Sequence, residues 1–138
     1  IQYAEPGTGV ARSEEQDLDE ILELAADFPA RVAEVRERWT HTVRTAHQEG
    51  RCIAIWGGSS KCVAFLTTNK LGPEISYIVD VNVHKQGKYL PGTGHLVSSP
   101  EVLREAKPDL VIVMNPIYLD EIRADLATMG ISAEVVAV

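Results

Sequence analysis

At 138 residues, the chain has the length of a single domain and can bury a hydrophobic core without disulfide bonds or a structural metal. Its shares of hydrophobic residues (45%) and charged residues (24%) are ordinary for globular proteins and exclude a disordered chain and a coiled-coil filament. Twenty acidic residues against 13 basic ones give a formal net charge of −7, which argues against nucleic acids and anionic membranes as partners.

The amino-terminal part is predicted to be a short lead followed by helix. Residues 1–12 show no hydrophobic periodicity and predict a flexible lead. Residues 13–50 predict a helical segment that opens with capping-box spacing from Ser13 to Gln16. Because Pro29 lacks the N–H that a helix interior needs, we expect it to begin a second helix. This helical pair either packs on the main domain or presents a second face to a domain outside this sequence.

Residues 51–138 alternate short apolar runs with helical segments. Apolar runs predict strands at 52–56, 75–79, 95–97, 110–114 and 134–138. Helical patterns predict one helix with Val63, Ala64, Leu66 and Thr67 that is stopped by Gly72 and Pro73. They also predict helices at 100–107, with Ser99 as its cap, and at 117–129. Strands that alternate with helices predict a Rossmann-like α/β domain, a parallel sheet of about five strands covered on both faces in three layers. Right-handed crossovers favour the strand order 3-2-1-4-5.

Ligands of such sheets bind beyond the carboxyl ends of the strands, here between the first and fourth strands. The turn from Gly57 to Cys62 stands where a dinucleotide-binding fingerprint would stand, but it keeps only the first glycine. Ser59 replaces the glycine that lets a pyrophosphate approach the backbone, although free N–H groups at a helix start and the charge of Lys61 still favour an anion. Two interpretations stay open: a phosphate site and a purely structural turn.

Asp80 and the loop behind it carry most of the polar side chains near the predicted crevice. At the end of the second strand, Asp80 either hydrogen-bonds a ribose or caps its own loop. A long ordered loop such as residues 80–95 is usually functional. Its lysines could hold phosphate and its tyrosine could stack on a base or sugar ring. The alternative is a solvated loop with a purely structural role. We expect its His84–Gly92 part to wall the crevice. The candidate ligand-binding residues are Gly57, Ser59, Lys61, Asp80, Asn82, His84, Lys85, Lys88, Tyr89, Asn115 and Tyr118.

No pattern in the sequence indicates catalysis, a metal site or a membrane segment. Cys52 and Cys62 are too few for a disulfide framework or a thiolate zinc cage, and we expect both to be buried in the core. His84 and His95 have no carboxylate or cysteine at metal-ligand spacing. No apolar run approaches the roughly 18 residues of a membrane span, and no signal segment opens the chain, so we expect a cytoplasmic protein. Because the first residue is Ile1, we expect a piece of a longer chain.

Several segments together carry a more specific pattern. They are Ile-Trp-Gly-Gly-Ser-Ser-Lys at residues 55–61, the run of residues 77–93, Lys-Pro-Asp at 107–109 and Asn-Pro-Ile-Tyr at 115–118. Over about residues 30–138 the chain resembles the C-terminal domain of SAM-dependent C-methyltransferases, a family whose members include enzymes that methylate carbon on nucleotide-linked deoxysugars. The string His-Lys-Gln-Gly-Lys-Tyr-Leu-Pro-Gly makes the resemblance specific, because it is long and lies in a loop whose sequence packing alone does not dictate.

The resemblance implies a parent chain with a zinc-binding N-terminal domain, a central SAM-binding methyltransferase domain and this Rossmann-like domain, which forms part of the substrate cleft. A nucleotide-linked sugar is then the ligand, and the methyltransferase domain of the same parent is the partner. Neither SAM nor zinc is expected in this chain, and the isolated chain is not expected to turn over substrate. Ser59 and Cys62 depart from family glycines, which weakens the case for a close phosphate contact. The alternative is a free-standing module that binds a nucleotide or nucleotide sugar.

Overall fold

The structure is a computed structural model that describes residues 17–138. The chain divides into two units, residues 1–35 and residues 36–138, and the boundary falls within helix α1 (Leu18–Gln48). None of the helices in the part of the chain that the structure describes is long and apolar enough to cross a membrane. The predicted capping box at Ser13 and Gln16 lies outside the described residues.

The prediction that Pro29 begins a second helix is wrong, because α1 is one helix with Pro29 inside it. A proline in a helix interior removes one backbone hydrogen bond and crowds the preceding turn. Alanine, leucine, glutamate and arginine on both sides favour the helical conformation, and together they outweigh that local defect. Pro29 is therefore a local defect within one helix and does not mark a boundary between two helices.

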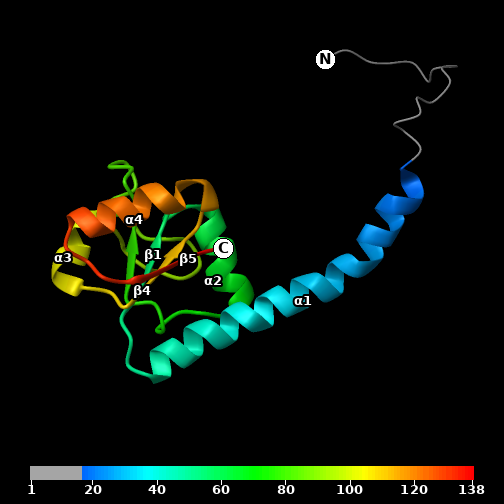
Figure 1. The fold of residues 1–138 in the computed structure, drawn as a ribbon, viewed down its shortest axis with the longest axis horizontal. Coiled ribbons are helices and arrows are strands. Elements are labelled where there is room, and N and C mark those ends of the chain that lie inside the picture. The colour runs from blue at the N-terminus through cyan, green and yellow to red at the C-terminus, as the bar shows by residue number, and fades with distance from the viewer. Residues whose placement is uncertain (1–16) are drawn as a thin grey trace, which may run out of the picture. The chain divides into compact units, whose positions relative to one another are not determined.

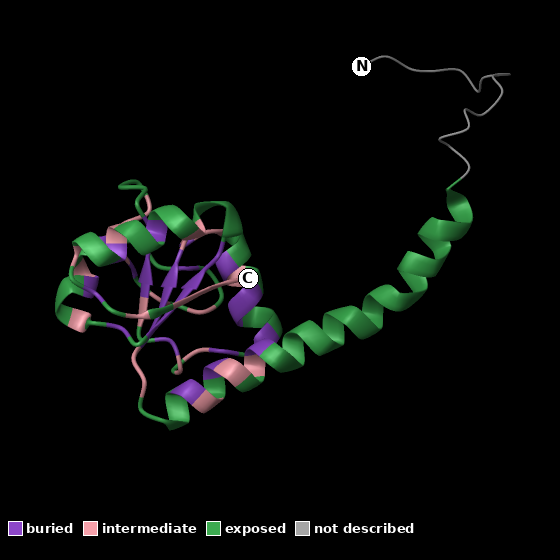
Figure 2. Cartoon of the chain, in the orientation of Figure 1, coloured by how far each residue is buried: buried purple, intermediate pink, exposed green. Residues whose placement is uncertain are grey.

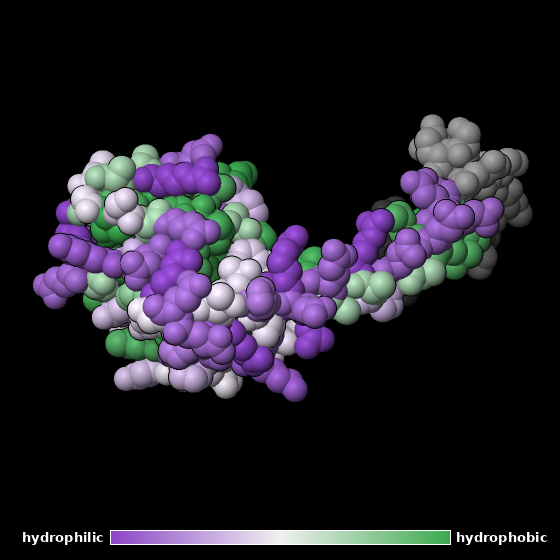
Figure 3. Space-filling model, turned by 60° about the horizontal axis from the view of Figure 1, so that its bottom comes forward, coloured by the Kyte–Doolittle hydropathy of each residue, from purple (hydrophilic) through white to green (hydrophobic). Residues whose placement is uncertain are grey.

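The part of α1 before residue 36 exposes its apolar side chains (Figure 2). Apolar and hydrophilic surfaces lie side by side along it (Figure 3). The exposed apolar residues of this part are Leu18, Ile21, Leu22, Leu24, Phe28, Val32 and Val35.

Five parallel strands form one sheet in the order β3-β2-β1-β4-β5, which confirms the predicted topology. Their bounds are β1 (Ile53–Trp56), β2 (Tyr77–Val79), β3 (Val97–Ser98), β4 (Leu110–Val113) and β5 (Glu134–Ala137). β1 and β4 are buried along their whole length, as expected for central strands of a parallel sheet covered on both faces. In register, Trp56 lies opposite Val79 on one side and Val113 on the other, so the carboxyl ends of three strands are level.

Helices cover both faces of the sheet (Figure 1). α2 (Ser60–Asn69) shares one core with strand residues such as Ile53 and Ile55, and α4 (Leu119–Thr128) shares the other with their neighbours. Short 3-10 helices, η2 (Pro100–Val102) and η3 (Pro116–Tyr118), precede α3 (Leu103–Ala106) and α4 respectively. Ser99 occupies the capping position before η2, but its hydroxyl donates to the side chain of Glu101 and does not cap the backbone, contrary to expectation.

The part of α1 after residue 35 packs on the α/β unit through an aromatic contact. Trp39 meets Phe65 of α2 edge to face, with ring centroids 5.5 Å apart and an interplanar angle of 82°. Val43 and Ala46 follow at helical spacing in the same core. The predicted packing of the helical segment on the main domain therefore holds for these residues.

A polar cluster that joins α1 to the segment before β2 is centred on Glu74. The carboxylate accepts the N–H of Gly72 at 2.8 Å and lies 3.7 Å from the Nε of Arg44. Burial raises the pKa of Glu74, but the hydrogen bonds from the Gly72 and Glu74 amides and the charges of Arg44 and His47 outweigh it. The net result is a pKa below the usual value.

Replacing Trp39 with alanine should lower the free energy of unfolding by about 3 kcal/mol, because it empties a buried aromatic site. Phe28→Ala is the matched control, since Phe28 is 65% exposed, and it should change stability by no more than about 0.5 kcal/mol. Urea unfolding measures both changes in stability, and far-UV circular dichroism is a suitable signal because it does not rely on the fluorescence of the deleted tryptophan. Equal losses in the two variants would contradict the assignment of Trp39 to the core.

The stabilisation from Glu74 should depend on pH. Because its pKa is lower in the folded chain than in the unfolded chain, the ionised carboxylate stabilises the fold above its unfolded pKa of about 4.3. This contribution is lost as the pH falls through the folded pKa. Glu74→Gln should therefore be less stable than the parent chain by about 1 kcal/mol at pH 7, and the difference should vanish at low pH. A difference that stays constant from pH 7 to pH 3 would rule out this charge effect.

Candidate functional site

A crevice of about 640 Å³ opens at the carboxyl ends of β1, β2 and β4, and we name it the strand-tip crevice. Its volume lies in the range of sites for small molecules, and its position is the one where open parallel sheets bind ligands. Four apolar side chains, Trp56, Val113, Met114 and Ile122, lie along its inner part. The other lining residues are Gly57, Ser59, Lys61, Asp80, Val81, Lys85, Asn115, Tyr118, Glu121 and Asp125.

The turn after β1 packs so closely on its neighbours that two glycines are required. Gly57 has a φ of +116°, and a Cβ added there would lie 3.1 Å from the Cβ of Met114. A Cβ added at Gly58 would lie 2.9 Å from the methyl carbons of Val97. Larger residues would push the turn away from the sheet. The glycines therefore have a packing role, and they hold the start of α2 at the crevice.

The start of α2 presents positive charge to the crevice. Ser59, in an extended conformation, makes no side-chain cap hydrogen bond, and no acidic residue occupies the first turn. The first N–H groups of a helix have no partner within it, and they carry the positive end of the helix dipole. Lys61 in this first turn is exposed and lines the crevice. This side of the crevice is suited to an anionic group.

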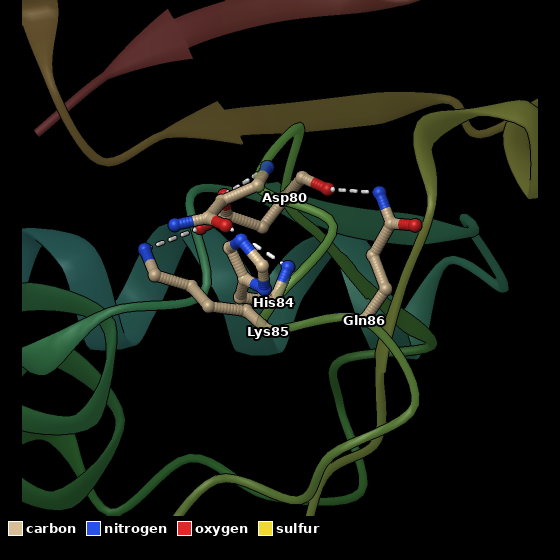
Figure 4. Close-up of polar contacts among 5 residues, drawn as sticks. Asp80, His84, Lys85 and Gln86 are labelled. Carbon is tan, nitrogen blue, oxygen red and sulfur yellow. Dashed lines mark hydrogen bonds and ion pairs between the residues drawn. The ribbon is translucent and has the colours of Figure 1, made fainter.

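Asp80 is buried, and each of its three oxygen atoms accepts a hydrogen bond from its own loop (Figure 4). One carboxylate oxygen accepts the N–H of Asn82 at 2.9 Å, and the other accepts the ammonium of Lys85 at 2.9 Å. The Asp80 carbonyl accepts the side-chain amide of Gln86 at 2.9 Å. Of the two open interpretations of Asp80, these contacts support the capping of its own loop. The same contacts hold Lys85 in the crevice.

The rest of the loop leaves the crevice. The N–H of Gly87 donates to the carbonyl of Val97, and the N–H of Val97 donates to the carbonyl of Lys88, both at 2.8 Å. Tyr89 forms an antiparallel bridge with Leu96, so the chain runs back beside the segment that leads into β3. Within the expected wall from His84 to Gly92, Lys85 is the residue that lines the crevice.

The structure thus divides the sequence-predicted residues into two groups. Seven line the strand-tip crevice: Gly57, Ser59, Lys61, Asp80, Lys85, Asn115 and Tyr118. Four do not, because the loop turns away or their side chains serve the loop itself: Asn82, His84, Lys88 and Tyr89. The closeness of these four residues to Asp80 in the sequence could not predict that they lie outside the crevice. The path of the loop depends on its backbone hydrogen bonds to residues 95–97.

Sequence reasoning missed the contribution of α4. Glu121, Ile122 and Asp125 lie at helical spacing on one face of α4 and line the crevice. The available signal was topological: the helix that follows the fourth strand must begin at the carboxyl edge, so its first two turns border the site. The two carboxylates make this side of the crevice acidic, opposite the positive start of α2.

The two cysteines lie in different surroundings. Burial, and to a smaller extent the negative charge of Asp80, raise the pKa of the Cys62 thiol to about 12. Cys62 is therefore a protonated core thiol, as expected. Cys52 is only half-buried and precedes β1, so its expected place in the core is wrong; its backbone N–H donates to the Asp109 carboxylate at 2.8 Å. Within residues 17–138, no three histidine, cysteine, aspartate or glutamate side chains gather to hold a metal ion.

Comparison with known proteins shows which family the chain belongs to. The family model described as the C-methyltransferase C-terminal domain matches residues 7–135. The chain is also 34% identical over 97 residues to the C-methyltransferase NovU of Streptomyces niveus. That match covers 70% of this chain and 23% of NovU, so it spans less than a quarter of the relative's length. Since the family model matches nearly the whole sequence, the chain belongs to the C-methyltransferase C-terminal domain family.

Proposed function

We propose that this domain forms the nucleotide-sugar side of the substrate cleft in a SAM-dependent C-methyltransferase. Membership in the C-methyltransferase C-terminal domain family and the similarity to NovU support the parent activity. The observation that carries the ligand class is the two-sided charge of the strand-tip crevice, positive at Lys61 and the start of α2 and acidic at α4. A nucleotide-linked sugar offers a matching pair of groups, an anionic diphosphate and a hydroxyl-rich ring.

The diphosphate is assigned to the α2 side. Unpaired helix N–H groups and the ammonium of Lys61 attract phosphate oxygens, and Lys85 adds a second ammonium that Asp80 already holds in place. Because Asp80 neutralises Lys85, the charge of Lys61 and the helix start supply most of the attraction. The side chain of Ser59 limits the approach of a pyrophosphate to the backbone of the turn. The phosphate contacts are therefore assigned to the N–H groups at the start of α2 and to the two lysines.

The sugar is assigned to the α4 side and the open mouth of the crevice. Carboxylates accept hydrogen bonds from hydroxyl groups, and Glu121 and Asp125 line this side. Tyr118 is 52% exposed at the same edge. A sugar in this position stays accessible to groups held outside this domain, which a methyl transfer between two domains requires.

The chemistry itself is assigned to other parts of the parent protein. SAM supplies the methyl group when it is bound, and it is assigned to another domain of the parent protein. Any zinc of the parent is assigned to ligands beyond residues 17–138, since no ligand cluster forms among them. This domain binds and orients the substrate.

Isothermal titration of the 138-residue chain with TDP-glucose tests the proposal. We expect saturable binding that weakens as the salt concentration rises, because charge attraction to phosphate is screened. Lys61→Met should weaken binding about tenfold, equivalent to ~1.4 kcal/mol. Lys107→Met, the same change at an exposed lysine after α3 that does not line the crevice, should leave the affinity unchanged.

Two outcomes would refute the assignment. One is the absence of TDP-glucose binding at millimolar concentration by a chain shown to be folded. The other is saturable binding of SAM that Lys61→Met abolishes, which would make the crevice a cofactor site.

A further inference from the structure

The exposed part of α1 carries apolar side chains in the pattern of a coiled coil. From residue 18 to residue 35 they recur at alternating intervals of three and four, which places them in one stripe along the helix. We name this stripe the seam. All of its residues are exposed, and they are Leu18, Ile21, Ala25, Phe28, Val32 and Val35. The same spacing continues to Trp39, which the core of this chain already buries, so the seam is the part of the pattern that remains exposed.

The charges on this helix make it complementary to an antiparallel copy of itself. Residues 17–27 contain five acidic residues and no basic one, whereas residues 28–38 contain three arginines and two glutamates. A parallel pair of such helices would set the two acidic halves against each other. An antiparallel pair sets each acidic half against the half that carries the arginines. Asp17 of one helix and Arg38 of the other then lie at the flanks of the paired seams.

The sizes of the seam residues favour the same orientation. When two seams run antiparallel and are centred on each other, Phe28 of each copy faces Ala25 of the other. The large ring then fills the space that the small side chain leaves. In the same arrangement Ile21 faces Val32. A parallel pair would instead place the two Phe28 rings in one crowded layer and the two Ala25 methyl groups in an underfilled one.

We propose that the seam binds the seam of a second copy of this chain, so that the two helices form an antiparallel coiled coil. The contact is self-complementary and closes after two copies, because a two-fold axis relates them. Its length is about 27 Å at 1.5 Å per residue, which is short for a coiled coil. We therefore expect weak association, with a dissociation constant on the order of 100 µM. The strand-tip crevice is lined by other residues, so the dimer is independent of the proposed ligand.

Sedimentation of the 138-residue chain from low micromolar to millimolar concentration tests the association. We expect a monomer at the low end and a dimer at the high end. Phe28→Glu should remain monomeric throughout, because it would bury a carboxylate at the centre of both paired seams. Ile117→Glu is the matched control, since Ile117 lies on η3 and is 79% exposed, and it should dimerise like the parent chain. Far-UV circular dichroism checks that both variants are folded.

Disulfide trapping tests the orientation. In a Cys52→Ser background, Leu18→Cys and Val35→Cys are prepared separately and mixed under mild oxidation. The antiparallel pair brings these two positions together, whereas it holds two copies of residue 18 about 26 Å apart, too far for a disulfide. We expect the mixed disulfide between the two variants to dominate over disulfides within either variant.

Four outcomes would overturn this inference. One is a monomer at millimolar concentration, which would leave the seam to another domain of the parent protein. The second is a dimer that Phe28→Glu does not weaken. The third is a dimer that Ile117→Glu abolishes, because the contact would then lie outside the seam. The fourth is disulfide formation chiefly between like variants, which would show a parallel pair. None of these outcomes bears on the binding of TDP-glucose, so the proposed function is tested separately.

Discussion

The buried carboxylate of Asp80 is the interaction on which the carboxyl edge of the sheet depends. Its two oxygens hold the Asn82 amide and the Lys85 ammonium, and its backbone joins Gln86 and Ser98. A buried carboxylate is costly unless it is paired and hydrogen-bonded, so these contacts specify one conformation of the loop after β2. The same conformation places Lys85 in the strand-tip crevice. One structural carboxylate thus organises the loop side of the strand-tip crevice.

The close packing of the turn after β1 completes this arrangement from the other side. Gly57 and Gly58 let the backbone lie against Met114 and Val97, and the turn leads directly into α2. Because β1, β2 and β4 end level, the helix start, the Asp80 loop and the first turns of α4 meet at one edge. Binding groups from distant sequence positions are brought together by the parallel topology, and no long-range ion pair is needed to gather them.

The sheet could be predicted from the sequence because the central strands of a parallel sheet consist of short, continuous apolar runs, as residues 110–114 do. It failed at Pro29, where the helical preference of the neighbours outweighed one lost hydrogen bond. In the site, residues next to strand ends, such as Gly57, Lys61 and Asn115, were predictable from topology. Lys88 and Tyr89 were not, because hydrogen bonds to Val97 and the bridge to Leu96 steer that stretch away from the crevice. Predicting Glu121 and Asp125 would have required knowing which face of α4 borders the crevice, as well as where the helix begins.

We propose that this domain receives its ligand at the carboxyl edge of the sheet. The most direct test is a ¹⁵N–¹H NMR titration of the chain with TDP-glucose, which maps perturbed backbone amides onto the fold. We expect the largest shifts at residues 57–62, 81–86 and 115–118, and no shifts in the segments 70–73 and 91–95 at the opposite edge. Shifts centred on that opposite edge, with residues 57–62 silent, would contradict it.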